Sequence, residues 1–155
     1  MRKLVQACLA SGALLGVVAL GGCEAPKSQV TYLISAAAQI NPDASNRPSP
    51  VVVRFYELKS SGIFESAEFF ALYSEEAKTL GATLIARKEV QIGPSETREI
   101  VEDLQPGTRA IGIVAAFRNL SSNKWRAVFP VKEGTSVPIE VTLGPNGISV
   151  KSPSN

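Results

Sequence analysis

The chain has 155 residues, of which 16 are Lys or Arg, 14 are Asp or Glu and none is His. The lack of histidine excludes Ser-His and Cys-His catalytic arrangements and removes the commonest metal ligand. Two of the basic residues are Arg2 and Lys3, so the chain from Cys23 onward has no net charge and no basic surplus to hold nucleic acid.

The first 22 residues have the layout of a secretory signal peptide. Arg2 and Lys3 precede an apolar, uncharged run from Leu4 to Leu20, which ends in two glycines. The run is slightly shorter than the roughly 20 residues of a stable membrane span, and no basic cluster follows it. We therefore predict a signal peptide over residues 1–22, with a retained membrane anchor as the alternative.

The sequence L-G-G-C at residues 20–23 resembles a bacterial lipobox. The resemblance implies cleavage before Cys23 and its covalent modification by diacylglycerol and an N-linked acyl chain such as palmitate, with no other cofactor. Several acyl chains anchor a protein stably, whereas a single chain anchors it only marginally. A free thiol or a disulfide is the alternative, but the only other cysteine, Cys8, lies in the segment to be removed. The resemblance to enterobacterial lipoproteins implies that Glu24, in place of Asp, favours sorting to the outer membrane.

Residues 23–29 are expected to form a short lipidated tether and residues 30–152 a single domain. The six residues from Glu24 to Gln29 span only about 20 Å when fully extended. The domain is therefore expected to lie close to the membrane surface.

The domain begins with two strand-like stretches separated by a long loop. Residues 30–35 and 51–58 are rich in β-branched and aromatic residues, and Val51, Val53 and Phe55 alternate onto one face. Between the two stretches, Ala38–Pro50 contains three prolines together with Asn, Ser and Asp, which are typical turn residues. Loops of this length are often functional, and their prolines lower the entropy lost on binding; a plain variable connector is the alternative.

A helical pattern follows the second strand. Apolar side chains at Phe69, Leu72 and Leu80 recur at helical spacing within residues 64–80. We expect one helix, or two short helices broken near Ser74, with Ser66 as N-cap and Gly81 at the C-terminal end.

The remaining stretches predict six short strands between turns that contain Gly, Pro or Asn. The expected strands cover residues 82–92, 96–101, 109–117, 125–131, 137–143 and 148–151. Short strands at this spacing predict a mainly β fold, a two-sheet β-sandwich with a short helical insertion after strand two.

Three further features have both a structural and a functional interpretation. Trp125 is either a core aromatic or a binding hot spot. The helical aromatics Phe69, Phe70 and Tyr73 either pack on the sandwich or line an exposed groove. Arg54 is either a partner contact or a side chain that snorkels at a sheet edge.

Several stretches, taken in order, resemble the TssJ family, lipoproteins of the bacterial type VI secretion system. These are NPDASNRPSPVVVRFYEL (41–58), FESAEFFALY (64–73), the Leu80-Gly81 step, GIVAAFR (112–118) and KWR (124–126). The resemblance covers nearly the whole chain after the lipobox. It implies a transthyretin-like sandwich at the periplasmic face of the outer membrane and no enzymatic activity.

The resemblance also implies the partners. The domain would bind the periplasmic C-terminal region of TssM, an inner-membrane protein, in a complex that also contains TssL. The loop between the first two strands is the binding element in this family. The corresponding residues here are Gln39, Ile40, Asn41, Pro42, Asp43, Asn46, Arg47 and Pro48.

Two other function classes stay open at the level of sequence. One is a periplasmic, lipid-anchored module that binds a small ligand, which predicts an apolar pocket with converging polar groups. The other is a histidine-free envelope hydrolase, which predicts a buried Lys or a carboxylate pair with a strongly shifted pKa in a cleft.

Overall fold

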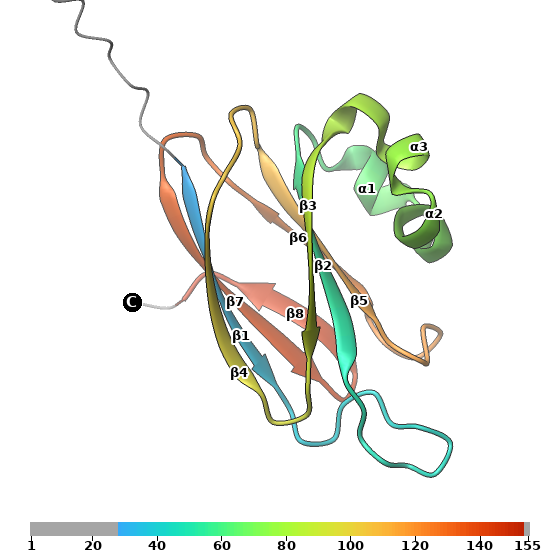
Figure 1. Cartoon of the computed structure of the whole chain (residues 1–155). Coiled ribbons are helices and arrows are strands. Elements are labelled where there is room, and N and C mark those ends of the chain that lie inside the picture. Colours follow the sequence, from blue (N-terminus) through green and yellow to red (C-terminus); the bar gives the residue numbers. More distant parts are fainter. Residues whose placement is uncertain (1–27, 154–155) are drawn as a thin grey trace, which may run out of the picture.

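The computed structural model describes residues 28–153, which form two four-stranded sheets packed face to face with three short helices outside one of them (Figure 1). This confirms the predicted two-sheet sandwich with a helical insertion after strand two. The predicted signal peptide, Cys23 and most of the predicted tether lie outside the described residues. The strands are β1 (Gln29–Ala36), β2 (Val51–Leu58), β3 (Leu84–Ile92), β4 (Thr97–Asp103), β5 (Ala110–Ala116), β6 (Arg126–Pro130), β7 (Ser136–Gly144) and β8 (Gly147–Lys151).

The first sheet has the strand order β4-β1-β7-β8 and the second β3-β2-β5-β6. All neighbours are antiparallel except β1 and β7, which run parallel over eight residue pairs. Strand β1 is therefore a central strand, bonded to β4 on one side and to β7 on the other. The connections β1–β2 and β3–β4 each pass from one sheet to the other.

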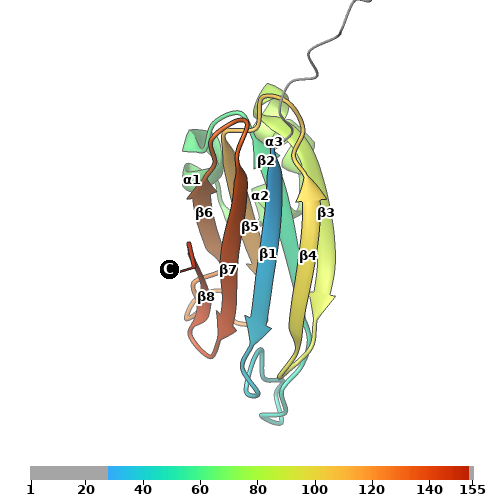
Figure 2. The same ribbon diagram turned by 90° about the vertical axis from the view of Figure 1, so that its left-hand side faces the viewer.

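The two ends of the sandwich carry different parts of the chain. Strand β1 starts at one end, and the loop that follows it lies at the other, as Figure 2 shows. The β3–β4, β5–β6 and β7–β8 connections lie at the same end as the β1–β2 loop. The register shows this, because Ser35 lies opposite Thr97, Ala36 opposite Leu143 and Val52 opposite Ala116. Loop 37–50 is thus separated from residue 28 by the full length of β1, about 26 Å at the rise of a strand.

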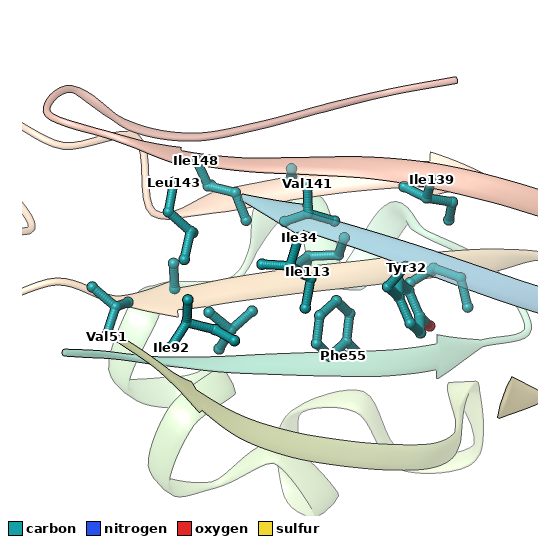
Figure 3. Close-up of a cluster of buried hydrophobic side chains, with 14 of the residues drawn as sticks. Tyr32, Ile34, Val51, Phe55, Ile92, Ile113, Ile139, Val141, Leu143 and Ile148 are labelled. Carbon is teal, nitrogen blue, oxygen red and sulfur yellow. The ribbon is translucent and has the colours of Figure 1, made fainter. Parts of the chain in front are cut away.

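The main core fills the space between the sheets (Figure 3). Val51, Val53 and Phe55 point into it, as predicted from their period-two alternation, and meet Ile34 and Val141 of the facing sheet. Both sheets and the whole of this core lie within residues 28–153. The two sheets thus share one hydrophobic core.

A second core lies between the outer face of the second sheet and the helices. The alternate residues of β2, Tyr56 and Leu58, are buried there against Phe64 and Leu72. Gly112 of β5 makes room for Phe64, because a Cβ on this glycine would lie 2.6 Å from the Phe64 ring. Strand β2 is consequently buried on both faces.

The helical insertion consists of α1 (Gly62–Ser66), α2 (Phe69–Ser74) and α3 (Glu76–Leu80), followed by a 3-10 turn over Gly81–Thr83. The expected break near Ser74 and the position of Gly81 after the last helix are confirmed. The expected N-cap role of Ser66 is wrong. Ser66 is the last residue of α1, and its hydroxyl bonds back to the carbonyl of Gly62 at 3.1 Å.

Side chains from elsewhere in the fold explain where these helices stop. The Arg126 guanidinium donates to the carbonyls of Phe64 and Ala67 at 2.9 and 2.6 Å, which ends α1. Three consecutive carbonyls at the end of α2 are also occupied, Ala71 by Thr79, Leu72 by Tyr56 and Tyr73 by Arg54. Each of these bonds replaces one that a continued helix would make.

No helix among residues 28–153 is long and apolar enough to cross a membrane.

Candidate partner-binding loop

Among the described residues, loop 37–50 is the longest connection between strands that contains no helix, and it extends beyond the end of the sandwich (Figure 1). It carries the chain from β1 in the first sheet to β2 in the second. At its start, the Ala37 N–H donates to the Leu143 carbonyl at 2.9 Å, and the Ala37 carbonyl accepts from Ser95 at 3.2 Å. The loop is therefore fastened to the end of β7 and to the β3–β4 connection before it leaves the domain.

The base of the loop is part of the core. Ile40 is fully buried in the main core, with 0% of its surface exposed. Its expected place among surface contacts to a partner is therefore corrected: the Ile40 side chain anchors the loop. The burial of one apolar residue within a polar stretch has a simple reason, since leaving it exposed would forgo about 2 kcal/mol.

Asn41 fixes the path of the loop with both ends of its side-chain amide. Its Nδ2 donates to the Pro50 carbonyl, and its Oδ1 accepts from the Arg118 backbone N–H, each at 2.7 Å. The residue is 6% exposed and has a φ of 47°, a left-handed conformation that Asn tolerates better than most residues. Ser49 closes the base, because its hydroxyl donates to the Asn41 carbonyl and its N–H to the Ile40 carbonyl. Asn41 thus has a structural role in the loop.

The tip of the loop is closed by Asp43 and Arg47. One Asp43 carboxylate oxygen accepts from the backbone N–H groups of Ser45 and Arg47, both at 2.9 Å. The other accepts from the Arg47 guanidinium at 2.9 and 2.8 Å. The pKa of the Asp43 carboxyl is lowered from 3.8, mainly by the backbone N–H of Arg47 and next by the Arg47 guanidinium. This five-residue ring holds Asn46 at a φ of 59° and presents it to solvent.

The exposed part of the predicted set lies around this ring. Gln39, Pro42, Asn46, Arg47 and Pro48 are exposed, and Asp43 is half-buried. Arg118, which sequence reasoning did not assign to the site, lies beside the loop and donates from Nε to the Ser49 hydroxyl at 3.2 Å. No local pattern in the sequence predicts this contact, because Arg118 and Ser49 are far apart along the chain.

A small cleft separates the loop from the neighbouring β5–β6 and β7–β8 connections. It is lined by Asn41, Pro42, Arg118, Asn119, Ser122, Asn123 and Pro145. The lining consists of amides, hydroxyls, prolines and one guanidinium, without an acidic residue. Such a surface suits hydrogen bonding to the backbone and side chains of a protein.

The other residues with two interpretations are also placed. Arg54 is neither at a sheet edge nor at a free surface, because it bonds Glu89 and Glu76 and lies 3.8 Å over the Tyr73 ring. Trp125 packs edge-on against Phe69 as a core aromatic. Phe70 differs from its neighbours, since 69% of its surface is exposed.

Two carboxyl groups of the described residues, Asp43 and Glu96, have a lowered pKa, and backbone N–H donors are the main cause. Among the described residues, no group of three or more His, Cys, Asp or Glu is placed to hold a metal ion.

Comparison with known proteins shows which family the chain resembles. Residues 28–146 match the family model described as "Type VI secretion lipoprotein, VasD, EvfM, TssJ, VC_A0113". A search of curated proteins found no match.

Solved structures match over nearly the whole described domain. The T6SS lipoprotein TssJ1 from Pseudomonas aeruginosa is 34% identical, with a TM-score of 0.80 over 84% of this chain and 99% of that chain. A chain of a structure entitled "Type VI membrane complex" is 27% identical, with a TM-score of 0.70 over 79% and 97%. A chain of "T6SS protein TssM C-terminal domain (869-1107) from EAEC" is 29% identical, with a TM-score of 0.64 over 82% and 99%.

Proposed function

Because the chain belongs to the type VI secretion lipoprotein family that includes TssJ, we propose that it is an outer-membrane lipoprotein that docks the periplasmic C-terminal region of TssM. Cys23 would carry the acyl chains, and the domain would face the periplasm in a complex that also contains TssL. The function is mechanical: lipid holds one end of the domain and a protein interface holds the other.

The observation that carries this proposal is the placement of the two attachment points. Residue 28, where the tether enters, and loop 37–50 lie at opposite ends of the sandwich (Figure 2). A loop at the anchored end would face the membrane surface. A loop at the far end is free to meet a protein that approaches from the other side of the periplasm.

The similar structures supply a second line of support. This chain covers 99% of the matched chain in the TssM C-terminal domain structure, using 82% of its own 155 residues. The matched chain is therefore close to this chain in length and much shorter than the range 869–1107 in that title. We infer that it is a second component beside the TssM domain, and that a lipoprotein of this fold accompanies TssM there.

The preorganised tip suits docking. The ring made by Asp43 and Arg47 and the prolines at positions 42, 48 and 50 hold the loop in one path before a partner arrives. Binding then orders few additional residues and loses less conformational entropy. Neutral and basic groups dominate the exposed tip, so an acidic or polar TssM surface is the expected counterpart.

Calorimetry tests the proposal, with residues 24–155 titrated against the periplasmic region of TssM from the same bacterium. Saturable 1:1 binding that is lost when the exposed tip is altered supports it. Replacing the whole stretch 39–47 would be a poor test, because it would remove Ile40 from the core and Asn41 from its bonds. Binding that is unchanged in a tip variant would place the interface elsewhere.

A further inference from the structure

A cleft lies far from loop 37–50, at the open edge of the sandwich between β3 and β4. Its volume is about 190 Å³, and its lining includes Tyr32, Phe55, Glu57, Lys88, Glu102 and Asp103. The strand pairing puts the cleft near the end where β1 begins, because Tyr32 lies opposite Ile100, and Phe55 lies opposite Lys88.

The inward-facing side chains of β3 and β4 change from apolar to charged at this edge. Along β3, Val90 and Ile92 pack against the main core, and the next residue on the same face is Lys88. On β4, Ile100 packs against the core, and the next inward residue is Glu102. Lys88 and Glu102 form an ion pair across the two edge strands. The sandwich is thus closed at this point by charges instead of apolar side chains.

Two aromatic rings form the floor of the cleft. Tyr32 and Phe55 are 2% and 3% exposed, and their ring centroids are 4.2 Å apart (Figure 3). The Tyr32 hydroxyl makes no hydrogen bond to any residue that the structure describes, whereas the other deeply buried tyrosine, Tyr56, donates to the Leu72 carbonyl. No fully enclosed side-chain polar atom within residues 28–153 lacks a partner. The Tyr32 hydroxyl therefore reaches the open space of the cleft.

A carboxylate converges on the same space. Glu57 accepts from the Gln105 N–H at 2.8 Å and from the Thr108 hydroxyl at 2.7 Å, both through Oε2, which leaves Oε1 without a bond to the described residues. Glu57 and Tyr32 line the same cleft, and the negative charge of Glu57 adds to burial in raising the pKa of Tyr32. Asp103 adds a second carboxylate at the exposed rim.

The basic groups of the lining are already neutralised. Lys88 pairs with Glu102, and Arg87 pairs with Glu76 and Glu89 on the helix side of the sheet. Glu57 and Asp103 have no cationic partner among residues 28–153, so the net character of the cleft is negative. A hydroxyl acceptor, a carboxylate and an aromatic floor together favour a cation that donates hydrogen bonds.

We propose that this edge cleft binds a guanidinium or alkylammonium group, supplied by an arginine or lysine side chain of a protein partner. The group would donate to the Tyr32 hydroxyl and to Glu57 over the Tyr32 and Phe55 rings. A volume of about 190 Å³ favours one side chain over a drug-sized ligand, which needs about 300 Å³ or more. The cleft is on a different part of the domain from loop 37–50, so its role does not depend on the docking proposed above.

NMR titration of residues 24–155 at low salt tests the inference. The probes are N-acetyl-arginine amide and N-acetyl-lysine amide, with N-acetyl-norleucine amide as a neutral match. We expect saturable shifts of the Tyr32 ring and of the Glu57 and Lys88 amides in the millimolar range with the two cationic probes only. Equal shifts with the norleucine probe, or no saturable shift with any probe, would overturn the proposal.

Two variants separate the site from general surface charge. Tyr32→Phe removes only the hydroxyl and Glu57→Gln only the charge, and each is expected to weaken binding about tenfold, as loss of one charge-assisted hydrogen bond does. Glu99→Gln, on the exposed outer face of β4, is the matched control and should bind as the unaltered chain does. If Glu99→Gln weakens binding of the cationic probes as much as Glu57→Gln does, the attraction is non-specific and the proposed site is overturned.

The source of the cation is tested with butylamine and methylguanidine. If butylamine and methylguanidine bind more weakly than the capped amino acids, a protein side chain is supported as the source of the cation, because the capped backbone then adds contacts. Equal binding would overturn that source and assign the cleft to free cations.

Discussion

The side-chain oxygen of Asn41 accepts a hydrogen bond from the backbone N–H of Arg118 at 2.7 Å and so joins loop 37–50 to the end of β5. The same side chain holds the far end of its own loop through the Pro50 carbonyl. A single amide therefore sets the position of the loop relative to β2 and β5 of the second sheet.

Asn41→Ala is expected to lower the free energy of unfolding by about 3 kcal/mol, through two lost bonds to buried backbone groups and a left-handed φ that Ala disfavours. Urea unfolding measures the loss. Asn46→Ala is the matched control, because Asn46 shares the left-handed φ but is exposed, and about 1 kcal/mol is expected there. Equal losses would remove the special role of Asn41.

The carboxyl of Asp43 should titrate below its ordinary pKa of 3.8. A lowered folded-state pKa stabilises the closed tip above the unfolded pKa, and this stabilisation is lost as pH falls through the folded value. Exchange of the Ser45 and Arg47 amides should therefore speed up in that acidic window. In Arg47→Ala the backbone donor remains, so the pKa should rise only part of the way to 3.8; a complete return in an NMR titration would contradict the assignment.

Arg54 fastens the helices to the second sheet. Arg54→Ala leaves the Tyr73 carbonyl without its donor and removes one of the two guanidinium partners of Glu76, the other being Arg87. We expect the free energy of unfolding to fall by about 2–3 kcal/mol. Lys78→Ala is the control, because the Lys78–Glu75 pair is on the surface, with the Lys78 side chain 82% exposed. A change below about 0.5 kcal/mol is expected there; similar losses in the two variants would contradict the role of Arg54.

Gly112 is required by the ring of Phe64. Gly112→Ala should destabilise the fold by about 2 kcal/mol, the typical cost of overpacking, because its Cβ would lie 2.6 Å from the ring. Gly62→Ala meets nothing within 4 Å and lies in α1, so thermal unfolding should show no loss or a small gain. Adding Phe64→Leu to Gly112→Ala should recover part of the stability, and no recovery would point to a different cause.

The exposed tip is the expected TssM contact. The triple variant Pro42→Ala, Asn46→Gly, Pro48→Ala removes exposed side chains and leaves the Asp43–Arg47 ring and Asn41 in place. We expect at least about tenfold weaker binding in calorimetry, equivalent to about 1.4 kcal/mol. Lys59→Ala with Ser60→Ala, exposed in the connection after β2, is the control and should bind normally. Equal binding by both variants would contradict a tip interface.

Local patterns in the sequence predict the strands well because period-two alternation is set by the pleat itself. Val51, Val53 and Phe55 illustrate this, and the β2 bounds are those expected from the sequence. The break near Ser74 was expected from the sequence, but the end of α1 involves a partner distant in sequence, Arg126, and Tyr56 likewise occupies a carbonyl of α2. No local signal contains those contacts.

The candidate site was likewise predictable from the sequence only in part. The position and length of the loop are evident from its prolines and turn residues. The burial of Ile40 and Asn41 is not, because it depends on the space left by the facing sheet and on the backbone of Arg118. The charged edge cleft was also missed, since Tyr32, Glu57 and Lys88 come from three different strands.

The central position of β1 has a consequence for how the domain bears force. A pull that separates residue 28 from loop 37–50 acts along the axis of β1, which is bonded to β4 and β7 on its two sides. The bonds of both ladders then lie across the load and share it, so they must shear together instead of opening one at a time. Tension applied between the two ends should meet a strong mechanical clamp, and pulling the chain from its C-terminus should instead peel the short edge strand β8.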